Sequence, residues 1–185
     1  MTLDRILPFT KYLLEKCVKK GDFVVDATSG NGNDTLFLSQ LVDEDGHVLA
    51  FDIQEAAIAK TKLRLIDEQI KNVTLVHDGH ENVRTYTNQE VAAAIFNLGY
   101  LPGSDEQITT NSQTTWKAVT ELLQLLRVGG VIILVIYHGH PAGQVEKMEL
   151  ERLLTTLESG VTEVLRYEFL NKSAAPYVVA IERRR

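Results

Sequence analysis

Apolar and polar positions along the chain fall into blocks that predict strands and helices in turn. Short apolar runs rich in β-branched residues, typical of buried parallel strands, occupy residues 23–25, 48–51, 73–76, 91–96 and 131–136. Helical periodicity is found over residues 34–42, 54–69 and 111–126. This alternation predicts a Rossmann-like α/β fold, a doubly wound sheet with helices on both faces.

The C-terminal part departs from the alternation. After a helical pattern over residues 145–157, two strand candidates at 161–170 and 177–181 are separated by only six residues. A crossover between parallel strands needs a dozen residues or more, so these two strands should form an antiparallel hairpin. A dinucleotide-binding domain would continue with βαβ units. The class I methyltransferase sheet ends in such a hairpin, and resemblance to it implies seven mostly parallel strands in the order 3-2-1-4-5-7-6.

Composition limits the class of protein further. A chain of 185 residues with 44% hydrophobic residues supports one core, so we expect a single domain over 1–185. No signal peptide or apolar run of about 20 residues is found, which predicts a cytoplasmic protein. The net charge of -6 argues against a broad nucleic-acid footprint but leaves room for a local RNA contact. Cys17, the only cysteine, lies in an apolar helical pattern and reads as a structural thiol.

The segment DATSGNGN, residues 26–33, follows the first strand, where ligands of open α/β sheets bind. Gly30 and Gly32 would permit a tight turn, but Thr35 stands where a dinucleotide fingerprint has its third glycine. Asp34 would repel a pyrophosphate at the helix N-terminus, whereas S-adenosylmethionine has cationic groups and no phosphate. The segment resembles the first motif of class I S-adenosylmethionine-dependent methyltransferases, although Thr28 replaces the first of its three glycines.

Acidic residues also follow the second and third strands. Asp52 lies about 20 positions past the loop, where a carboxylate can accept hydrogen bonds from both ribose hydroxyls. Asp78 stands where the methyltransferase resemblance implies a partner for the adenine amino group. The residues that we expect to bind the cofactor S-adenosylmethionine are Asp26, Thr28, Gly30, Asn31, Gly32, Asn33, Asp52, Gln54, Asp78, Gly79, His80 and Asn97.

The segment FNLGYLPG, residues 96–103, follows the fourth strand. Asn97 and Tyr100 stand at the first and fourth places of the Asn/Asp-Pro-Pro-Tyr/Phe motif of methyltransferases that act on nitrogen. In that motif two acceptors hold the hydrogens of the amine, so that its lone pair points at the methyl group. Tyr100 could stack on a base, or it could be a buried tyrosine before a turn at Pro102 and Gly103.

Two histidines follow the fifth strand in the segment YHGHP, residues 137–141. A zinc site is not expected, because no cysteine and no matching acid–histidine pair accompanies them. His138 or His140 could serve as a base for the amine, or both could be structural. The expected catalytic residues are Asn97, Tyr100, His138 and His140, and the expected substrate contacts are Tyr100, Pro102, Gly103, Tyr137 and His138.

Together, the strings FNLGYLPGSD and YHGHPAG and residues 26–32 resemble the small bacterial YtqB/MnmM family, also described as rRNA methylases. The resemblance implies methyl transfer to tRNA, converting 5-aminomethyl-2-thiouridine at the wobble position to its 5-methylaminomethyl form. An anticodon stem-loop could then be held by basic residues such as Arg5, Lys11, Lys16 or Arg84. An rRNA or small-molecule methyltransferase, and a non-catalytic S-adenosylmethionine- or nucleotide-binding regulator, remain alternatives.

The sequence also offers a possible surface for a homodimer. Leu150, Leu153, Leu154 and Leu157 form an apolar stripe on one helix. Burial of this stripe on the protein's own sheet is the preferred interpretation.

Overall fold

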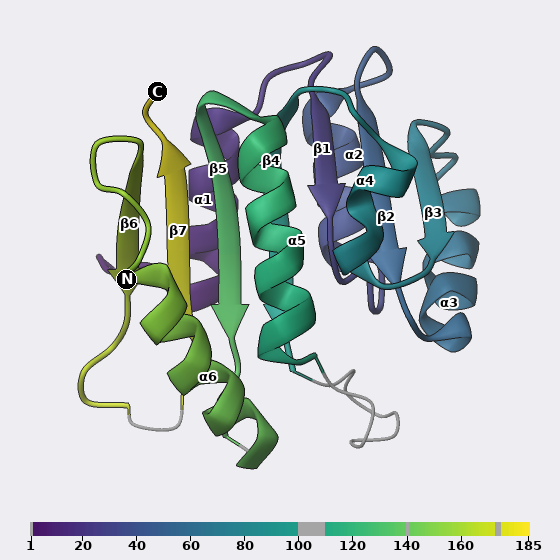
Figure 1. The fold of residues 1–185 in the computed structure, drawn as a ribbon. Coiled ribbons are helices and arrows are strands. Elements are labelled where there is room, and N and C mark those ends of the chain that lie inside the picture. Colours follow the sequence, from purple (N-terminus) through teal and green to yellow (C-terminus); the bar gives the residue numbers. More distant parts are fainter. Residues whose placement is uncertain (1, 100–109, 140, 173–174) are drawn as a thin grey trace.

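The computed structural model describes residues 2–99, 110–139, 141–172 and 175–185 and contains one seven-stranded sheet of order β3-β2-β1-β4-β5-β7-β6 (Figure 1). The strands are β1 (Phe23–Asp26), β2 (His47–Asp52), β3 (Val73–His77), β4 (Val91–Leu98), β5 (Leu126–Ile136), β6 (Thr162–Tyr167) and β7 (Tyr177–Arg183). Strands β1 to β5 run parallel, whereas β7 is antiparallel to both β5 and β6. The predicted order and terminal hairpin are confirmed.

Helices cover both faces of the sheet (Figure 1). They are α1 (Ile6–Cys17), α2 (Asn33–Val42), α3 (Glu55–Asp67), the 3-10 helix η1 (His80–Asn82), α4 (Val83–Tyr86), α5 (Ser112–Leu125) and α6 (Pro141–Leu154). One core cluster joins α4, α5 and α6 to the sheet, and the other joins α1 and α2 to the opposite face. None of the helices in the described ranges has the length and hydropathy of a membrane span.

Several element boundaries differ from the sequence prediction. Strand β5 begins at Leu126, five residues before its apolar run, because this end also pairs with β4 across an irregularity. The glycines Gly129 and Gly130 interrupt the apolar pattern there without ending the strand. Helices α1 and α4 were not delimited from the sequence, since α4 is a single turn and half of α1 is exposed.

The leucine stripe of α6 packs on its own sheet, as predicted. Leu150 and Leu154 are buried in the core shared with α5, and Leu157 packs against that core from just beyond the helix. Leu153 is half-buried. The stripe therefore packs mainly in the protein's own core.

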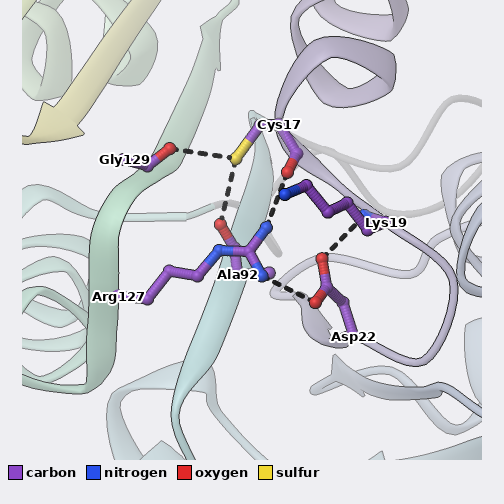
Figure 2. A network of polar contacts seen from close by, with 6 residues as sticks. All are labelled: Cys17, Lys19, Asp22, Ala92, Arg127 and Gly129. Carbon is purple, nitrogen blue, oxygen red and sulfur yellow. Dashed lines mark hydrogen bonds and ion pairs between the residues drawn. The ribbon is translucent and has the colours of Figure 1, made fainter.

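The C-terminal end of α1 is clamped to the amino-terminal ends of β4 and β5 by a polar network (Figure 2). The Arg127 guanidinium donates to Asp22 Oδ1 and to the Cys17 carbonyl, both at 2.6 Å. The Cys17 thiol contacts the carbonyls of Ala92 at 3.3 Å and Gly129 at 3.4 Å. Burial raises the pKa of Cys17, so the thiol stays protonated and serves packing.

Candidate active site

A cavity of about 1230 Å³ opens where the carboxyl ends of β1 to β5 meet α1 and α2. The sheet order reverses between β1 and β4, and ligands of open α/β sheets bind at such a switch point. Among the described residues, every buried side-chain polar atom without a partner belongs to a residue that lines this cavity. These atoms are Ser29 Oγ, Asn31 Oδ1, His80 Nε2 and His138 Nε2. Buried polar groups are normally paired, so these atoms indicate that the cavity accommodates a polar ligand.

The loop after β1 forms the first wall of the cavity. Gly30 and Gly32 have φ values of 50° and 76°, in the left-handed region that favours glycine. The Gly32 N–H donates to the Ser29 carbonyl at 2.7 Å and closes the turn before α2. The predicted glycine turn is therefore present, and it exposes Asn31 and Asn33 to the cavity.

Asp26 supports this loop from below. Its carboxylate is fully buried and accepts hydrogen bonds from Thr35 Oγ1 at 2.6 Å and Thr28 N at 3.2 Å. Burial raises the pKa of Asp26 to about 7; the negative charge of Asp34 adds to the rise, and the two hydrogen bonds oppose it. Asp26 is not among the residues that line the cavity, so its position suits a support for the loop better than a ligand contact.

Asp52, at the end of β2, is fixed by two backbone donors. Its Oδ2 accepts from Gly30 N at 2.8 Å and its Oδ1 accepts from Gln54 N at 2.9 Å. A carboxylate has about four lone-pair positions, so two remain for a ligand. The residue lines the cavity with a defined orientation, which suits the predicted contact with a diol.

Asp78, after β3, is held by three donors: Gly79 N at 2.7 Å, Tyr86 Oη at 2.8 Å and Asn82 Nδ2 at 3.0 Å. The hydrogen bond from Tyr86 is the largest cause of the lowered pKa of Asp78, so the carboxylate stays ionised. Asp78 lines the cavity, where its carboxylate can accept hydrogen bonds. The neighbouring Gly79 is not among the lining residues.

His80 lies beside these acids, at the start of η1. Its Nδ1 donates to the Ala27 carbonyl at 3.0 Å, because a carbonyl oxygen can only accept. Burial lowers the pKa of His80, which favours the neutral ring. The buried Nε2 is then left as an acceptor without a partner among the described residues, in a side chain that lines the cavity.

Asn97 connects the loops that follow β4 and β1. Its backbone N–H donates to Thr28 Oγ1 at 2.7 Å, and its side-chain Nδ2 donates to Asp34 Oδ2 at 2.7 Å. Within the described ranges, no donor binds Asn97 Oδ1 or Asp34 Oδ1. The pair lines the cavity across the switch point from Asp52 and Asp78.

The comparisons with known proteins agree with this geometry. Residues 48–182 match the family described as "Putative rRNA methylase". The chain belongs to this rRNA methylase family. It is 37% identical over 182 residues to the chloroplastic tRNA (mnm5s2U34)-methyltransferase of Arabidopsis thaliana, with 92% of this chain covered. The chain spans 66% of the length of that relative.

Solved structures of similar sequence have the same fold. A crystal structure from Clostridium thermocellum, described as a "putative rRNA-methylase", has a TM-score of 0.97 and 42% identity, covering 99% of this chain and 100% of that one. A "putative methyltransferase" from Streptococcus mutans "in complex with SAH" has a TM-score of 0.90 and 37% identity, covering 98% and 99% of the two chains.

The methylase fold brings most of the expected site residues together. The expected residues that line the cavity are Thr28, Gly30, Asn31, Asn33, Asp52, Gln54, Asp78, His80, Asn97, Tyr137 and His138. Asp26, Gly32 and Gly79 are not among the lining residues. Tyr100, Pro102, Gly103 and His140 lie outside the described residues. Partial burial raises the pKa of Tyr137, and the charge of Asp34 adds to the rise.

Helices α1 and α2 supply a wall that sequence reasoning missed, apart from Lys11. Leu7, Pro8, Lys11, Tyr12, Glu15, Phe37 and Gln40 line the cavity from these helices. In α1 the opposite side holds the buried Ile6, Thr10 and Leu14, so the amphipathic pattern of residues 6–17 was the available signal. Lys11 Nζ lies 4.8 Å from the centre of the Phe37 ring, which gives this wall both charge and a flat apolar surface.

Proposed function

We propose that the protein is an S-adenosylmethionine-dependent methyltransferase that methylates the 5-aminomethyl group of 2-thiouridine at the tRNA wobble position. The observation that carries the proposal is the place of Asn97, whose side chain lines the same cavity as Asp52 and Asp78. An acceptor for an amine thus shares one cavity with acceptors suited to an adenosine. The activity named for the Arabidopsis relative supports this choice of substrate.

The residues of the cavity fit S-adenosylmethionine, which supplies an electrophilic methyl group when it is bound. The unused lone pairs of Asp52 would accept from the ribose hydroxyls, and Asp78 would accept from the adenine amino group. The loop of residues 28–33 would hold the methionine part, with the unpaired Ser29 Oγ and Asn31 Oδ1 as polar contacts. The complex named for the S. mutans relative supports this assignment.

The tRNA would approach over α1. Arg5 is the N-cap residue of α1, and Lys11 and Lys16 lie within it. Lys16 Nζ lies 4.9 Å from the centre of the exposed Tyr12 ring. These cations would hold phosphates of an anticodon stem-loop, and Tyr12 offers a face for base stacking.

Arg84 is not part of this surface. It lies in α4, which belongs to the core cluster on the opposite face of the sheet from α1, and its Nε is 3.6 Å from Glu121 Oε2. We therefore restrict the proposed RNA contact to the basic residues of α1.

The direct test is mass spectrometry of nucleosides from tRNA bearing 5-aminomethyl-2-thiouridine, after incubation with the purified protein and S-adenosylmethionine. A gain of one methyl group on that nucleoside would support the proposal. If S-adenosylmethionine binds but this nucleoside is unchanged, rRNA and small amines become the substrates to test. Binding with no transfer to any of these would favour the non-catalytic regulator.

Two finer expectations belong to the same proposal. We expect the enzyme to act in the cytoplasm, which cell fractionation would test. The assembly to test is a homodimer, which sedimentation of the purified protein would detect.

A further inference from the structure

The orientation of the Asn97 amide is determined by Asp34. A carboxylate can only accept, so the amide group that faces Asp34 Oδ2 at 2.7 Å must be the Nδ2 donor. The planar amide then presents its other atom, the acceptor Oδ1, as the group available to a ligand. Asp34 thus converts an amide with two possible orientations into a fixed acceptor in the cavity wall.

Among the described residues, Asp34 has one carboxylate oxygen without a donor and no lysine or arginine within ion-pair distance. Its Oδ1 receives no hydrogen bond from the described residues, and no ion pair within those ranges includes Asp34. Among the described residues, the lysine and the arginine that line the cavity contact other groups. Arg64 donates to Asn31 O and Asn33 Oδ1, and Lys11 lies over the Phe37 ring. Asp34 therefore lies in the cavity wall without an ion-pair partner among the described residues, in the first turn of α2, where the helix dipole favours a carboxylate.

The backbone near Asn97 leaves Asp34 as a suitable second acceptor. The Leu98 carbonyl, which directly follows Asn97, already accepts from Tyr137 N at 3.2 Å. Asp34 Oδ1 and Asn97 Oδ1 are in contrast both without a described donor. They belong to two side chains that are hydrogen-bonded to each other and line one cavity.

We propose that Asp34 and Asn97 form an amine-binding pair, which receives the two hydrogens of a primary amine and selects an aliphatic amine over the neutral exocyclic amine of a base. This inference rests on the proposed function and deepens it. A carboxylate strongly favours a group that carries or develops positive charge, and an aliphatic amine meets that condition. The exocyclic amine of adenine or cytosine does not, because its lone pair is delocalised into the ring.

The reaction moves positive charge toward this carboxylate. The amine nitrogen forms a bond to the methyl carbon, and the carbon–sulfur bond breaks with its electron pair left on sulfur. The nitrogen then carries the positive charge that the sulfonium has lost, and a proton leaves from it to water. A fixed anion beside the nitrogen stabilises this developing charge, which is the main way in which enzymes stabilise polar transition states.

The first experiment measures binding to two anticodon stem-loops by calorimetry, with S-adenosylhomocysteine present. The stem-loops are identical except that one carries an aminomethyl group and the other a neutral hydroxymethyl group on the wobble 2-thiouridine. We expect the wild-type protein to bind the amine about 10-fold more tightly, as for a hydrogen bond to a charged group. Equal binding of the two stem-loops would overturn the pair, and this comparison needs no variant.

The second experiment uses Asp34→Asn, which keeps the shape and removes the charge. We expect the preference for the amine to fall below about 3-fold and kcat to fall about 100-fold, with affinity for S-adenosylhomocysteine unchanged within about 3-fold. Asp34→Glu, which retains the charge, should recover part of the preference. The matched control Asp45→Asn alters an exposed carboxylate after α2, away from the cavity lining, and should behave as wild type.

The outcomes distinguish a failure of the proposed function from a failure of the amine-binding pair. A wild-type protein that methylates no tRNA amine contradicts the proposed function. A wild-type protein that methylates it, together with an equally selective and active Asp34→Asn variant, contradicts only the pair. A loss of S-adenosylhomocysteine affinity as large as the loss of turnover would place Asp34 on the amino group of the cofactor and would also overturn the pair.

Discussion

The carboxylate of Asp52 accepts the backbone N–H of Gly30 at 2.8 Å and thereby joins the end of β2 to the glycine turn after β1. One side chain therefore both shapes the loop after β1 and, in our proposal, offers its remaining lone pairs to the cofactor. We expect Asp52→Ala to weaken S-adenosylmethionine binding by more than about 10-fold, because the variant loses both roles. Calorimetry would check this, with the exposed Glu44→Ala as the control. An unchanged affinity would refute the contact with the ribose.

Asn97 should affect turnover more than cofactor binding, because its free Oδ1 faces the nucleophile in our proposal. We expect Asn97→Ala to reduce kcat about 100-fold and to change S-adenosylmethionine affinity less than about 5-fold. Single-turnover kinetics and calorimetry on the same preparation would measure both. Equal losses in the two quantities would instead assign Asn97 to the cofactor.

Asp26 should make folding stability depend on pH. Its pKa rises from 3.8 to about 7 on folding, so the folded state binds more protons than the unfolded state between these values. The free energy of unfolding should therefore fall as the pH rises from about 4 to 7, by at most about 4 kcal/mol from this group. Urea unfolding of the wild type and Asp26→Asn across this range would show the difference. If the free energy of unfolding varied with pH in the same way for both proteins, the raised pKa of Asp26 would be contradicted.

The clamp at the C-terminal end of α1 should contribute to stability without contributing to the site. Arg127→Ala removes the donors to Asp22 and to the Cys17 carbonyl, and leaves the largely buried Asp22 carboxylate with the Lys19 N–H but no cation. We expect a loss of about 2 kcal/mol in the free energy of unfolding. Lys20→Ala, which removes the exposed ion pair with Asp43, should cost clearly less, because solvent screens that pair, and it serves as the comparison. Similar losses for both variants would show that the Arg127 network stabilises the fold no more than an exposed ion pair does.

The basic residues of α1 should affect RNA binding alone. Lys11→Glu is expected to weaken binding of the anticodon stem-loop about 10-fold, with a reduced dependence on salt, while leaving S-adenosylhomocysteine affinity unchanged. Arg84→Glu, on the opposite face of the sheet, should have a small effect. Filter binding at two salt concentrations would measure both variants. Equal effects would mean that the RNA does not approach over α1.

The sequence was sufficient for the fold because its signals are local. The six residues between the last two strand candidates, which are nine residues (168–176) between β6 and β7, are too few for a parallel crossover, and the acids Asp52 and Asp78 directly follow apolar runs. Every such residue reaches the same edge of a parallel sheet, so their convergence could be predicted without knowledge of distances. The register of β1 with β2 and β4 then completes the arrangement.

Contacts between distant residues could not be predicted in this way. The bond from Asn97 to Asp34 spans 63 positions, and nothing in either segment indicates the other. Asp26 has the same motif position as a ligand contact, yet the turn places its carboxylate beneath the loop. The exposed side of α1 resembles an ordinary solvated helix face, because only the packing of α1 beside α2 reveals a cavity there.

Thr28, which replaces the first glycine of the methyltransferase motif, has a structural role that glycine could not have. Its hydroxyl accepts the Asn97 N–H at 2.7 Å, so the residue that replaces a glycine also joins the loop after β1 to the end of β4. A glycine at this position would match the motif better but would leave the Asn97 N–H without this acceptor. At this position the residue that departs from the motif makes a hydrogen bond that the motif's glycine could not make. Because the donor is the backbone N–H of residue 97, this contact depends on the hydroxyl at position 28 and not on the side chain at position 97.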